Sequence, residues 1–269
     1  MSTVRSPGSI LEDVRRKRPL VHQITNFVVM NLTANAVIAA GGLPVMAIAP
    51  EEAQVIARAA DALVLNMGTP QRYTQDAMVL AGEAANQKGI PVVFDPVGAG
   101  LSPFRDNLFT LVSGAVRLTV IRGNLAEVSC LAGLRTRMRG VTAIGDAGSG
   151  AGIARVAAAQ LAATVAVTGK VDHASDGVRL ASCENGHEMM ALVSGSGCVV
   201  SALVGLFCAV EPDSLVAAAS ALAYAGVAGE RAARVAAGPA SFQVNWLDEL
   251  WRMKPSELDK FARIRWETE

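Results

Sequence analysis

The chain has 269 residues, of which 51% are hydrophobic and 4% aromatic, and its 24 basic and 24 acidic residues give a formal net charge of zero. This length allows one large α/β domain or two small ones. The absence of a basic excess argues against a nucleic-acid-binding protein and against binding to an anionic membrane surface. Because no repeat, linker or low-complexity tract divides the sequence, we expect a single domain over residues 1–269.

The cysteines, the histidines and the basic N-terminal run exclude further classes. The four cysteines have no paired metal spacing and the chain has only three histidines, which argues against a zinc site and indicates reduced thiols in a cytoplasmic protein. No apolar signal-peptide region follows the basic run at residues 15–18, so we expect this run to end a first helix. No apolar run is long and uninterrupted enough for a transmembrane span.

Short apolar runs alternate with segments of helical periodicity through the first two thirds of the chain. The apolar runs predict buried strands at residues 44–49, 62–67, 91–95, 118–122 and 164–168. Helical spacing is found between them, for example at residues 69–88 and 147–163. This alternation is typical of βαβ units, and predicts an α/β fold with a central, mostly parallel sheet flanked by helices on both faces.

The pattern changes after Thr168. Residues 171–180 are predicted to form a strand, a turn at Asp176-Gly177 and a second strand. From Cys198 to the end, the periodicity predicts an almost wholly helical region.

The N-terminal block at residues 19–35 places amides and hydroxyls in an apolar setting. Asn26, Asn31 and Asn35 could bind a small polar heterocycle, or could satisfy backbone groups at a helix start. His22 in this block is interpreted as a packing residue rather than a catalyst.

Polar residues follow the predicted strands, at the sheet edge where open α/β sheets bind ligands. Asp95 suits Mg²⁺ as a hard oxygen ligand, or caps the next turn. Arg122 could meet a phosphate, and Thr168 could contact a nucleotide or simply end a strand. Asn124 and Glu127 have the spacing of a helix capping box, and this interpretation competes with a role for Glu127 beside Mg²⁺.

Residues 193–203 read as a glycine- and serine-rich loop that leads into a helix at Cys198. The free N–H groups of a helix start bind anions, and the glycines let a phosphate approach the backbone. A thiol at this position is expected to have a lowered pKa, which makes Cys198 a candidate base. The alternative is a glycine-rich turn with a buried cysteine at the start of a core helix.

Together, an anion site, a base candidate, two carboxylates and an arginine describe phosphoryl transfer. The sequence has neither a Gly-x-x-x-x-Gly-Lys-Ser/Thr phosphate loop nor the protein-kinase signatures. If the chain is a kinase, it therefore belongs to another architecture.

An ordered set of motifs resembles the hydroxyethylthiazole kinase family, which is ribokinase-like and acts in thiamine biosynthesis and salvage. The motifs occupy residues 21–35, 42–47, 95–100, 122–124, 167–169, 172, 176–177 and 195–198. The resemblance implies a ribokinase-like fold and ATP-dependent phosphorylation of the primary alcohol of 4-methyl-5-(2-hydroxyethyl)thiazole, with Mg²⁺. It also implies a homotrimer with active sites between subunits.

The resemblance also implies roles for individual residues. Cys198 matches the position that most ribokinase relatives fill with an aspartate base. The other matches are substrate-binding positions at Asn26, Met46 and Gly195, nucleotide-binding positions at Arg122 and Thr168, and positions associated with Mg²⁺ and phosphate at Asp95 and Glu127. The chain departs from the family at Ser196, where Thr is common, and at Leu43 and Leu125, where smaller residues are common.

Three other functions remain open on the sequence. One is another ribokinase-like vitamin-precursor kinase, acting on pyridoxal or hydroxymethylpyrimidine. A second is the ATP-dependent dehydratase that repairs hydrated nicotinamide cofactors, and a third is a nucleotide-binding regulator without catalysis. Cys198 at the base position and the asparagine-rich N-terminal block favour the thiazole kinase over the other two enzymes.

Overall fold

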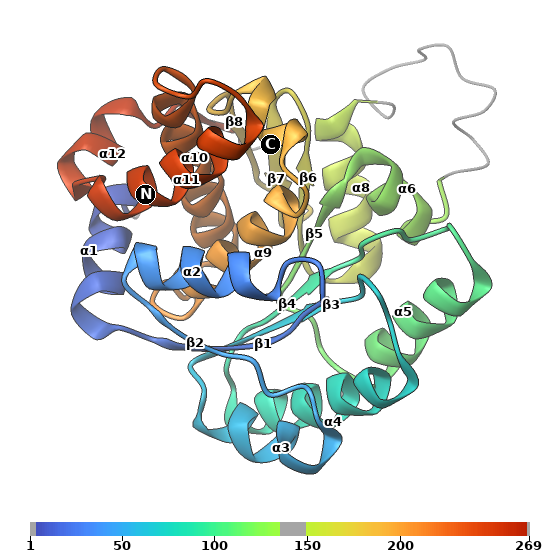
Figure 1. Ribbon diagram of the computed structural model, residues 1–269. Helices are drawn as coiled ribbons and strands as arrows, with labels where there is room; N and C mark the ends of the chain where they lie inside the picture. The colour runs from blue at the N-terminus through green and yellow to red at the C-terminus, as the bar shows by residue number, and fades with distance from the viewer. Residues whose placement is uncertain (1–3, 135–148, 268–269) are drawn as a thin grey trace.

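A nine-stranded sheet forms the centre of the computed structural model, which describes residues 4–134 and 149–267 (Figure 1). In sheet order the strands are β2 (Leu43–Val45), β1 (Leu20–Ile24), β3 (Ala62–Asn66), β4 (Val92–Asp95), β5 (Val120–Asn124), β6 (Thr164–Thr168), β7 (Asp172–Ser175), β8 (Leu180–Cys183) and β9 (Ile264–Glu267). Neighbours from β2 to β6 are parallel, and β6 to β9 are antiparallel.

Helices cover both faces of this sheet, as the alternating sequence pattern predicts (Figure 1). One face carries α1 (Pro7–Lys17), α2 (Met30–Ala40), α9 (Ser196–Cys208) and α10 (Ser214–Ala233), with α11 (Pro239–Arg252) and α12 (Pro255–Phe261) packed on them. The other carries α3 (Pro50–Ala59), α4 (Arg72–Lys88), α5 (Pro103–Ala115), α6 (Leu125–Leu131) and α8 (Gly150–Leu161). Each layer of helices buries its own hydrophobic cluster against the sheet.

Helix α9 lies directly on the central strands. It contacts β1, β3 and β4, and every residue from Cys198 to Cys208 is buried. The approach depends on Gly205, where a Cβ atom would lie 2.4 Å from Val64 Cγ2. A helix buried on all sides is hydrophobic all round, which explains the continuous apolar run after Cys198.

Most of the predicted elements are confirmed. The runs at residues 62–67, 91–95, 118–122 and 164–168 correspond to β3, β4, β5 and β6, because strands covered on both faces are apolar throughout. The predicted strand at residues 44–49 is shorter and forms β2 at the sheet edge. The hairpin prediction corresponds to β7 and β8, and the basic run does end helix α1.

Three further comparisons of the sequence predictions with the structure concern the C-terminal region, strand β1 and helix α8. The prediction of an almost wholly helical C-terminal region is wrong at β9, which pairs with β8. Strand β1 was not predicted, because the polar His22 and Gln23 interrupt its apolar pattern. The helix predicted at residues 147–163 is α8, and residues 147 and 148 lie outside the described residues.

Within residues 4–134 and 149–267, no helix combines the length and the hydrophobicity needed to cross a membrane.

The close approach of α9 to the sheet gives a prediction about stability. The change Gly205→Ala places a methyl group against Val64, so we expect the free energy of unfolding to fall by about 1–3 kcal/mol. Gly114→Ala in α5 is the matched control, because a Cβ there meets nothing within 4 Å. The control should leave stability unchanged or raise it by up to about 1 kcal/mol. Urea denaturation measures both variants, and equal effects would contradict close packing at Gly205.

Candidate active site

Four adjacent strands end in polar residues on the face that α9 covers. Asn66 of β3 pairs in register with Asp95 of β4, and Arg122 follows the residue of β5 that pairs with Phe94. Thr168 ends β6. Because the strands are parallel, their carboxyl ends form one edge of the sheet, and the N-terminus of α9 lies over it. The polar strand ends noted in the sequence are therefore brought together.

Cys198 lies in the first turn of α9 and is 8% exposed. Its Sγ atom accepts hydrogen bonds from Asn66 Nδ2 at 3.2 Å and from Asn26 Nδ2 at 3.6 Å. Burial, reinforced by the charge of Asp95, raises the pKa of this thiol to about 12. The prediction of a lowered pKa at this helix start is wrong, because loss of hydration outweighs the two amide donors and the charge of Arg122.

Asn66 connects Cys198 to Asp95. Its Nδ2 atom donates to Asp95 Oδ2 at 2.8 Å as well as to the thiol, and its Oδ1 atom accepts from Asn26 Nδ2 at 2.8 Å and from the Gly68 amide at 2.9 Å. Because the Gly68 N–H can only donate, the orientation of the Asn66 amide is fixed. The sequence marked Asn66 as a polar strand end but assigned it no role.

Asp95 is a buried carboxylate with one oxygen unsatisfied. Its Oδ2 atom accepts from Asn66 and from Ser201 Oγ, both at 2.8 Å, whereas its Oδ1 atom has no hydrogen-bond partner in the described part of the chain. Burial raises the pKa of Asp95 to about 6, although the nearby Arg122 opposes this shift. A free carboxylate oxygen that ionises near neutral pH fits a hard cation such as Mg²⁺.

Glu127 has a structural role that the capping-box interpretation predicted. Its Oε2 atom accepts from the Asn124 amide at 2.9 Å, and the Asn124 side chain accepts from the Glu127 amide at 2.9 Å. Its Oε1 atom accepts from the Gly98 amide at 2.9 Å, which ties the loop after β4 to α6. Both oxygens already serve backbone amides, so Glu127 fits a metal through water better than by direct contact.

The described residues contain no group of three or more His, Cys, Asp or Glu side chains placed to hold a metal ion. This does not conflict with Mg²⁺, which commonly uses one or two carboxylates and completes its coordination with phosphate oxygens and water.

A pocket of about 910 Å³ adjoins this polar edge. Arg122 and Thr168 both line it, and Arg122 Nη2 donates to Thr168 Oγ1 at 2.5 Å. The guanidinium lies against Gly197, where a Cβ atom would come within 2.5 Å of Nη1. Ser196 and Gly197, at the N-terminus of α9, also line the pocket, so a guanidinium and a helix start face the same space. This is the arrangement that an anionic ligand needs.

Gly195 joins the starts of two helices. It precedes α9 with a φ angle of +86°, and a Cβ atom there would lie 2.1 Å from Val29 Cγ1, at the start of α2. Two constraints therefore require glycine, namely the left-handed backbone and the contact with Val29. The loop with Asn26 thus lies beside the loop with Gly195, next to Cys198.

Met46 follows β2 and is half-buried, but it is not part of the hydrogen-bonded group around Cys198. The segment that carries it is held by His22, whose Nε2 atom lies 2.7 Å from the Ala47 carbonyl oxygen.

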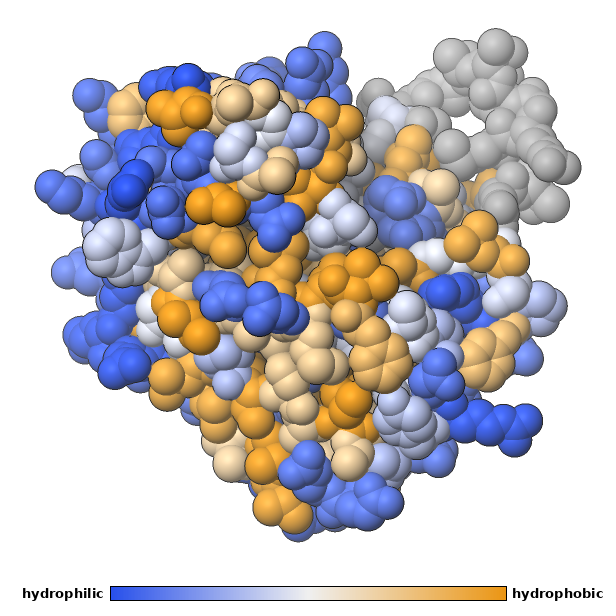
Figure 2. All heavy atoms as spheres, in the orientation of Figure 1, coloured by the Kyte–Doolittle hydropathy of each residue, from blue (hydrophilic) through white to orange (hydrophobic). Residues whose placement is uncertain are grey.

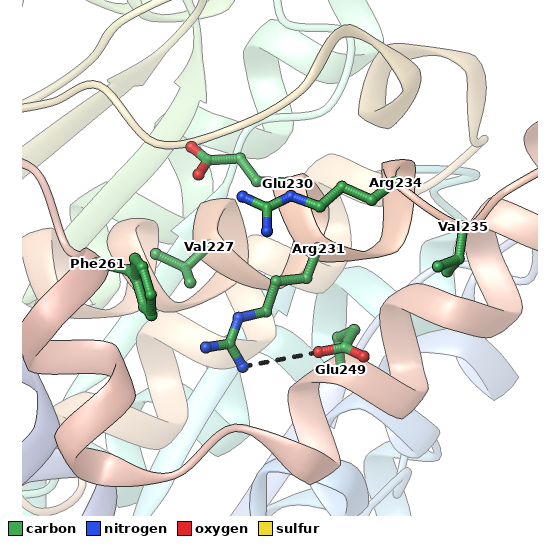
Figure 3. A pocket seen from close by; sticks show the side chains of 7 residues that line it. All are labelled: Val227, Glu230, Arg231, Arg234, Val235, Glu249 and Phe261. Atoms are coloured by element: carbon green, nitrogen blue, oxygen red, sulfur yellow. Dashed lines mark ion pairs between the residues drawn. The ribbon is translucent and has the colours of Figure 1, made fainter.

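A second pocket, of about 300 Å³, is lined by α10, α11 and Phe261 (Figure 3). Three of its charged side chains have partners in the protein. Arg231 lies 3.8 Å from Glu249 and 5.3 Å from the centre of the Phe261 ring, and Glu230 accepts from the Gly186 amide at 3.0 Å. None of the polar strand-end residues line this pocket, so the larger pocket is the candidate site.

Comparison with known proteins shows the family to which the chain belongs. The model of the Hydroxyethylthiazole kinase family matches residues 11–256. A hydroxyethylthiazole kinase of Moorella thermoacetica is 47% identical over 252 residues, covering 94% of this chain and 94% of its own. The solved structure of the hydroxyethylthiazole kinase protein from Pyrococcus horikoshii has a TM-score of 0.89 at 42% identity, covering 97% of this chain and 98% of its own. A ribokinase-like superfamily protein from Enterococcus faecalis shares the fold, with a TM-score of 0.64 at 16% identity over 95% of each chain.

The raised pKa of Asp95 predicts a pH-dependent stability difference. The folded protein binds the Asp95 proton more tightly than the unfolded chain, so wild type loses stability as pH rises from about 4 to about 6. Asp95→Asn cannot titrate there. The melting temperature of the variant, relative to wild type, should therefore rise between pH 4 and pH 8 by at least about 2 °C.

The measurement is thermal melting in low salt with a chelator present. Asp13→Asn is the control of opposite sign, because the hydrogen bond from Arg16 lowers the pKa of Asp13 to about 2. That variant should lose stability relative to wild type mainly as pH rises from about 2 to about 4, below the range in which Asp95 acts. A relative melting temperature of Asp95→Asn that does not change with pH would contradict a buried carboxylate with a raised pKa.

Proposed function

Because the chain belongs to the hydroxyethylthiazole kinase family, we propose that it phosphorylates the primary alcohol of 4-methyl-5-(2-hydroxyethyl)thiazole, with ATP as donor, in thiamine biosynthesis or salvage. The observation that carries the proposal is the position of Cys198. It lies in the first turn of α9, which begins after Gly195 and lines a large pocket, and its thiol contacts the loop that bears Asn26. A reacting alcohol and a phosphate chain need to meet at such a position.

ATP would occupy the pocket of about 910 Å³. Arg122 and the N–H groups of the first turn of α9 would bind its phosphates, with Thr168 orienting the guanidinium through the bond at 2.5 Å. Fixed donors of this kind stabilise the charge that spreads over the transferred phosphoryl group.

Mg²⁺ would be held by Asp95, through the unsatisfied Oδ1 atom, and by Glu127 through water. When bound, the ion supplies charge that offsets the phosphate oxygens during transfer. Asn66 and Ser201 fix the Asp95 carboxylate from the protein side, so its free oxygen has a defined position.

The thiazole alcohol would lie beside Asn26, Met46 and Gly195, with its hydroxyl at Cys198. A thiolate whose conjugate thiol has a pKa of about 12 is a strong base, but only a very small fraction of the thiol is ionised at neutral pH. In a loose transition state the alcohol keeps its proton until late, so a scarce base is tolerable. The contribution of Cys198 should therefore be modest. The amides of Asn26 and Asn66 favour the sulfur as acceptor.

A homotrimer with sites between subunits is the proposed assembly. Support comes from the face that carries α2, β2 and α3, where hydrophobic residues gather between charged margins (Figure 2). Large exposed apolar side chains on these elements and on the loop before α2 are Phe27, Val28, Ile38, Leu43 and Val55. Patches of this kind mark association surfaces, and closed cyclic symmetry would cover the same patch on each copy. Phe27 and Val28 adjoin Asn26, so the contact would reach the site.

We also propose a cytoplasmic location. Cys130, Cys183, Cys198 and Cys208 are all free thiols in the structure, and free thiols persist in reducing compartments.

The direct test is ADP release with ATP and Mg²⁺ over three alcohols, namely hydroxyethylthiazole, pyridoxal and hydroxymethylpyrimidine. Hydroxyethylthiazole should give the highest kcat/KM. A preference of more than about tenfold for another alcohol, equal to about 1.4 kcal/mol in the transition state, would refute the substrate assignment. ATP binding without turnover on any of them would favour a regulator, and turnover of hydrated NADH would favour the dehydratase.

Variants of Cys198 test its role as base. General-base catalysis contributes about 10²–10⁴-fold, and we expect Cys198→Ala to lose activity near the lower limit while ATP and the thiazole still bind. Cys198→Asp should retain substantial activity because a carboxylate is ionised at neutral pH. Cys198→Ser should resemble Ala, because a hydroxyl is a poorer proton acceptor. The measurement is kcat of each variant at saturating substrates. A wild-type rate for Cys198→Ala would show that Cys198 is only a packing residue.

A further inference from the structure

The pocket of about 910 Å³ contains a carboxylate that neither the strand-end cluster nor the phosphate-binding groups use. Asp172 begins β7 and lines this pocket with Arg122 and Thr168. Its Oδ1 atom accepts from the Gly169 amide at 2.9 Å. In residues 4–134 and 149–267 no hydrogen bond or ion pair to its Oδ2 atom is found. One oxygen is thus fixed by the backbone, and the other remains available to a ligand.

The pocket lining combines charged, polar and apolar residues. Arg122 and Gly197 make a cationic end, and Asp172 is near enough to Arg122 for the guanidinium to stabilise its charge. The rest of the lining is mixed, with apolar Val200, Leu222 and Ala225 on α9 and α10 and polar or charged Lys170, Glu184, Asn185, His187 and Glu188. A ligand that spans the pocket would therefore meet a cation, a carboxylate and an apolar surface.

The charge of the proposed nucleotide restricts which of its groups can face Asp172. ATP is anionic, and a carboxylate close to its phosphates would weaken binding unless it accepts hydrogen bonds from the ligand. The donors that ATP offers are the two ribose hydroxyls and the exocyclic amine of adenine. The ribose is joined directly to the phosphates and the adenine amine is farther from them. With the phosphates at Arg122, which is close to Asp172, the ribose hydroxyls are therefore the donors nearest to this carboxylate.

We propose that Asp172 accepts a hydrogen bond from a ribose hydroxyl of the nucleotide, and that it thereby makes the site select ribonucleotides over deoxyribonucleotides. The proposal rests on the proposed binding of ATP in this pocket. Burial raises the pKa of Asp172 to about 6, because the carboxylate has lost hydration. A donated hydroxyl replaces that hydration and favours the charged form.

The discrimination should be measurable by binding alone. A hydrogen bond to a charged group corresponds to about 10- to 100-fold in affinity, so 2′-deoxy-ATP or 3′-deoxy-ATP should bind the wild-type protein more weakly than ATP by such a factor. Asp172→Asn keeps an oxygen for the Gly169 amide but places an N–H₂ group where the second acceptor was. We expect it to bind ATP more weakly and to discriminate less than threefold between ATP and its deoxy analogues.

The experiment is calorimetric titration of the full chain with ATP, the two deoxy analogues and inosine triphosphate, in the presence of Mg²⁺ and without the alcohol. Glu188→Gln is the matched control, because it removes one negative charge from an exposed position of the same pocket and should keep the wild-type ratio. Melting temperatures establish that each variant is folded. The analogue comparison on wild type needs no variant at all.

The outcomes separate this proposal from the one on which it rests. Equal affinity of wild type for ATP and both deoxy analogues overturns the role of Asp172 while leaving ATP binding intact. A loss seen only with inosine triphosphate assigns the contact to the base, and also overturns it. An unchanged ratio in Asp172→Asn shows that another group reads the ribose. If wild type does not bind ATP, the proposed function and this inference both fail.

Discussion

The site depends on how closely α9 approaches the carboxyl ends of the central strands. The contact is possible because glycine stands at two positions, with Gly205 against Val64 and Gly197 against the Arg122 guanidinium. The approach brings the thiol of Cys198 and the hydroxyl of Ser201 onto groups that belong to β3 and β4. A helix displaced outward by the width of a methyl group would break these bonds, since hydrogen bonds weaken steeply beyond their normal length.

Close packing also excludes water from the site, and this loss of hydration shifts the pKa values of its titratable side chains. Cys198, Asp95 and Asp172 each have a pKa raised by burial, to about 12, about 6 and about 6. In each case nearby donors or Arg122 oppose the shift without cancelling it. Buried charge without full compensation costs stability, and an active site commonly retains such charge where a ligand compensates it. Asp172 lines the large pocket, and Cys198 and Asp95 lie in the hydrogen-bonded group at the strand ends beside it.

The sequence predicted the central strands because burial on both faces leaves a local trace, a continuous apolar run. It did not predict β1, where His22 and Gln23 are buried, nor β9, which depends on the free edge of β8. In the site, Asp95, Arg122 and Thr168 were found because parallel strands end at one edge. The connecting role of Asn66 was not predicted, because its contact with Cys198 joins residues 132 positions apart in the sequence. The pKa direction of Cys198 was wrong because a rule for helix starts takes no account of burial.

Asn66 shows why a neutral side chain suits the centre of this site. It lies between a thiol and a carboxylate, and its Nδ2 atom donates one hydrogen bond to each. A cation there would compensate Asp95 fully, and would compete with any metal for the free Oδ1 atom. An anion would place a second negative group beside Asp95 in a buried space. The amide gives both neighbours a hydrogen bond and does not neutralise the charge of Asp95. Its oxygen accepts from Asn26 and Gly68, and so links the carboxylate to the loop where the alcohol is proposed to bind. The proposed metal side and alcohol side of the site are thereby held in one rigid hydrogen-bonded unit, which is the positional control that phosphoryl transfer requires.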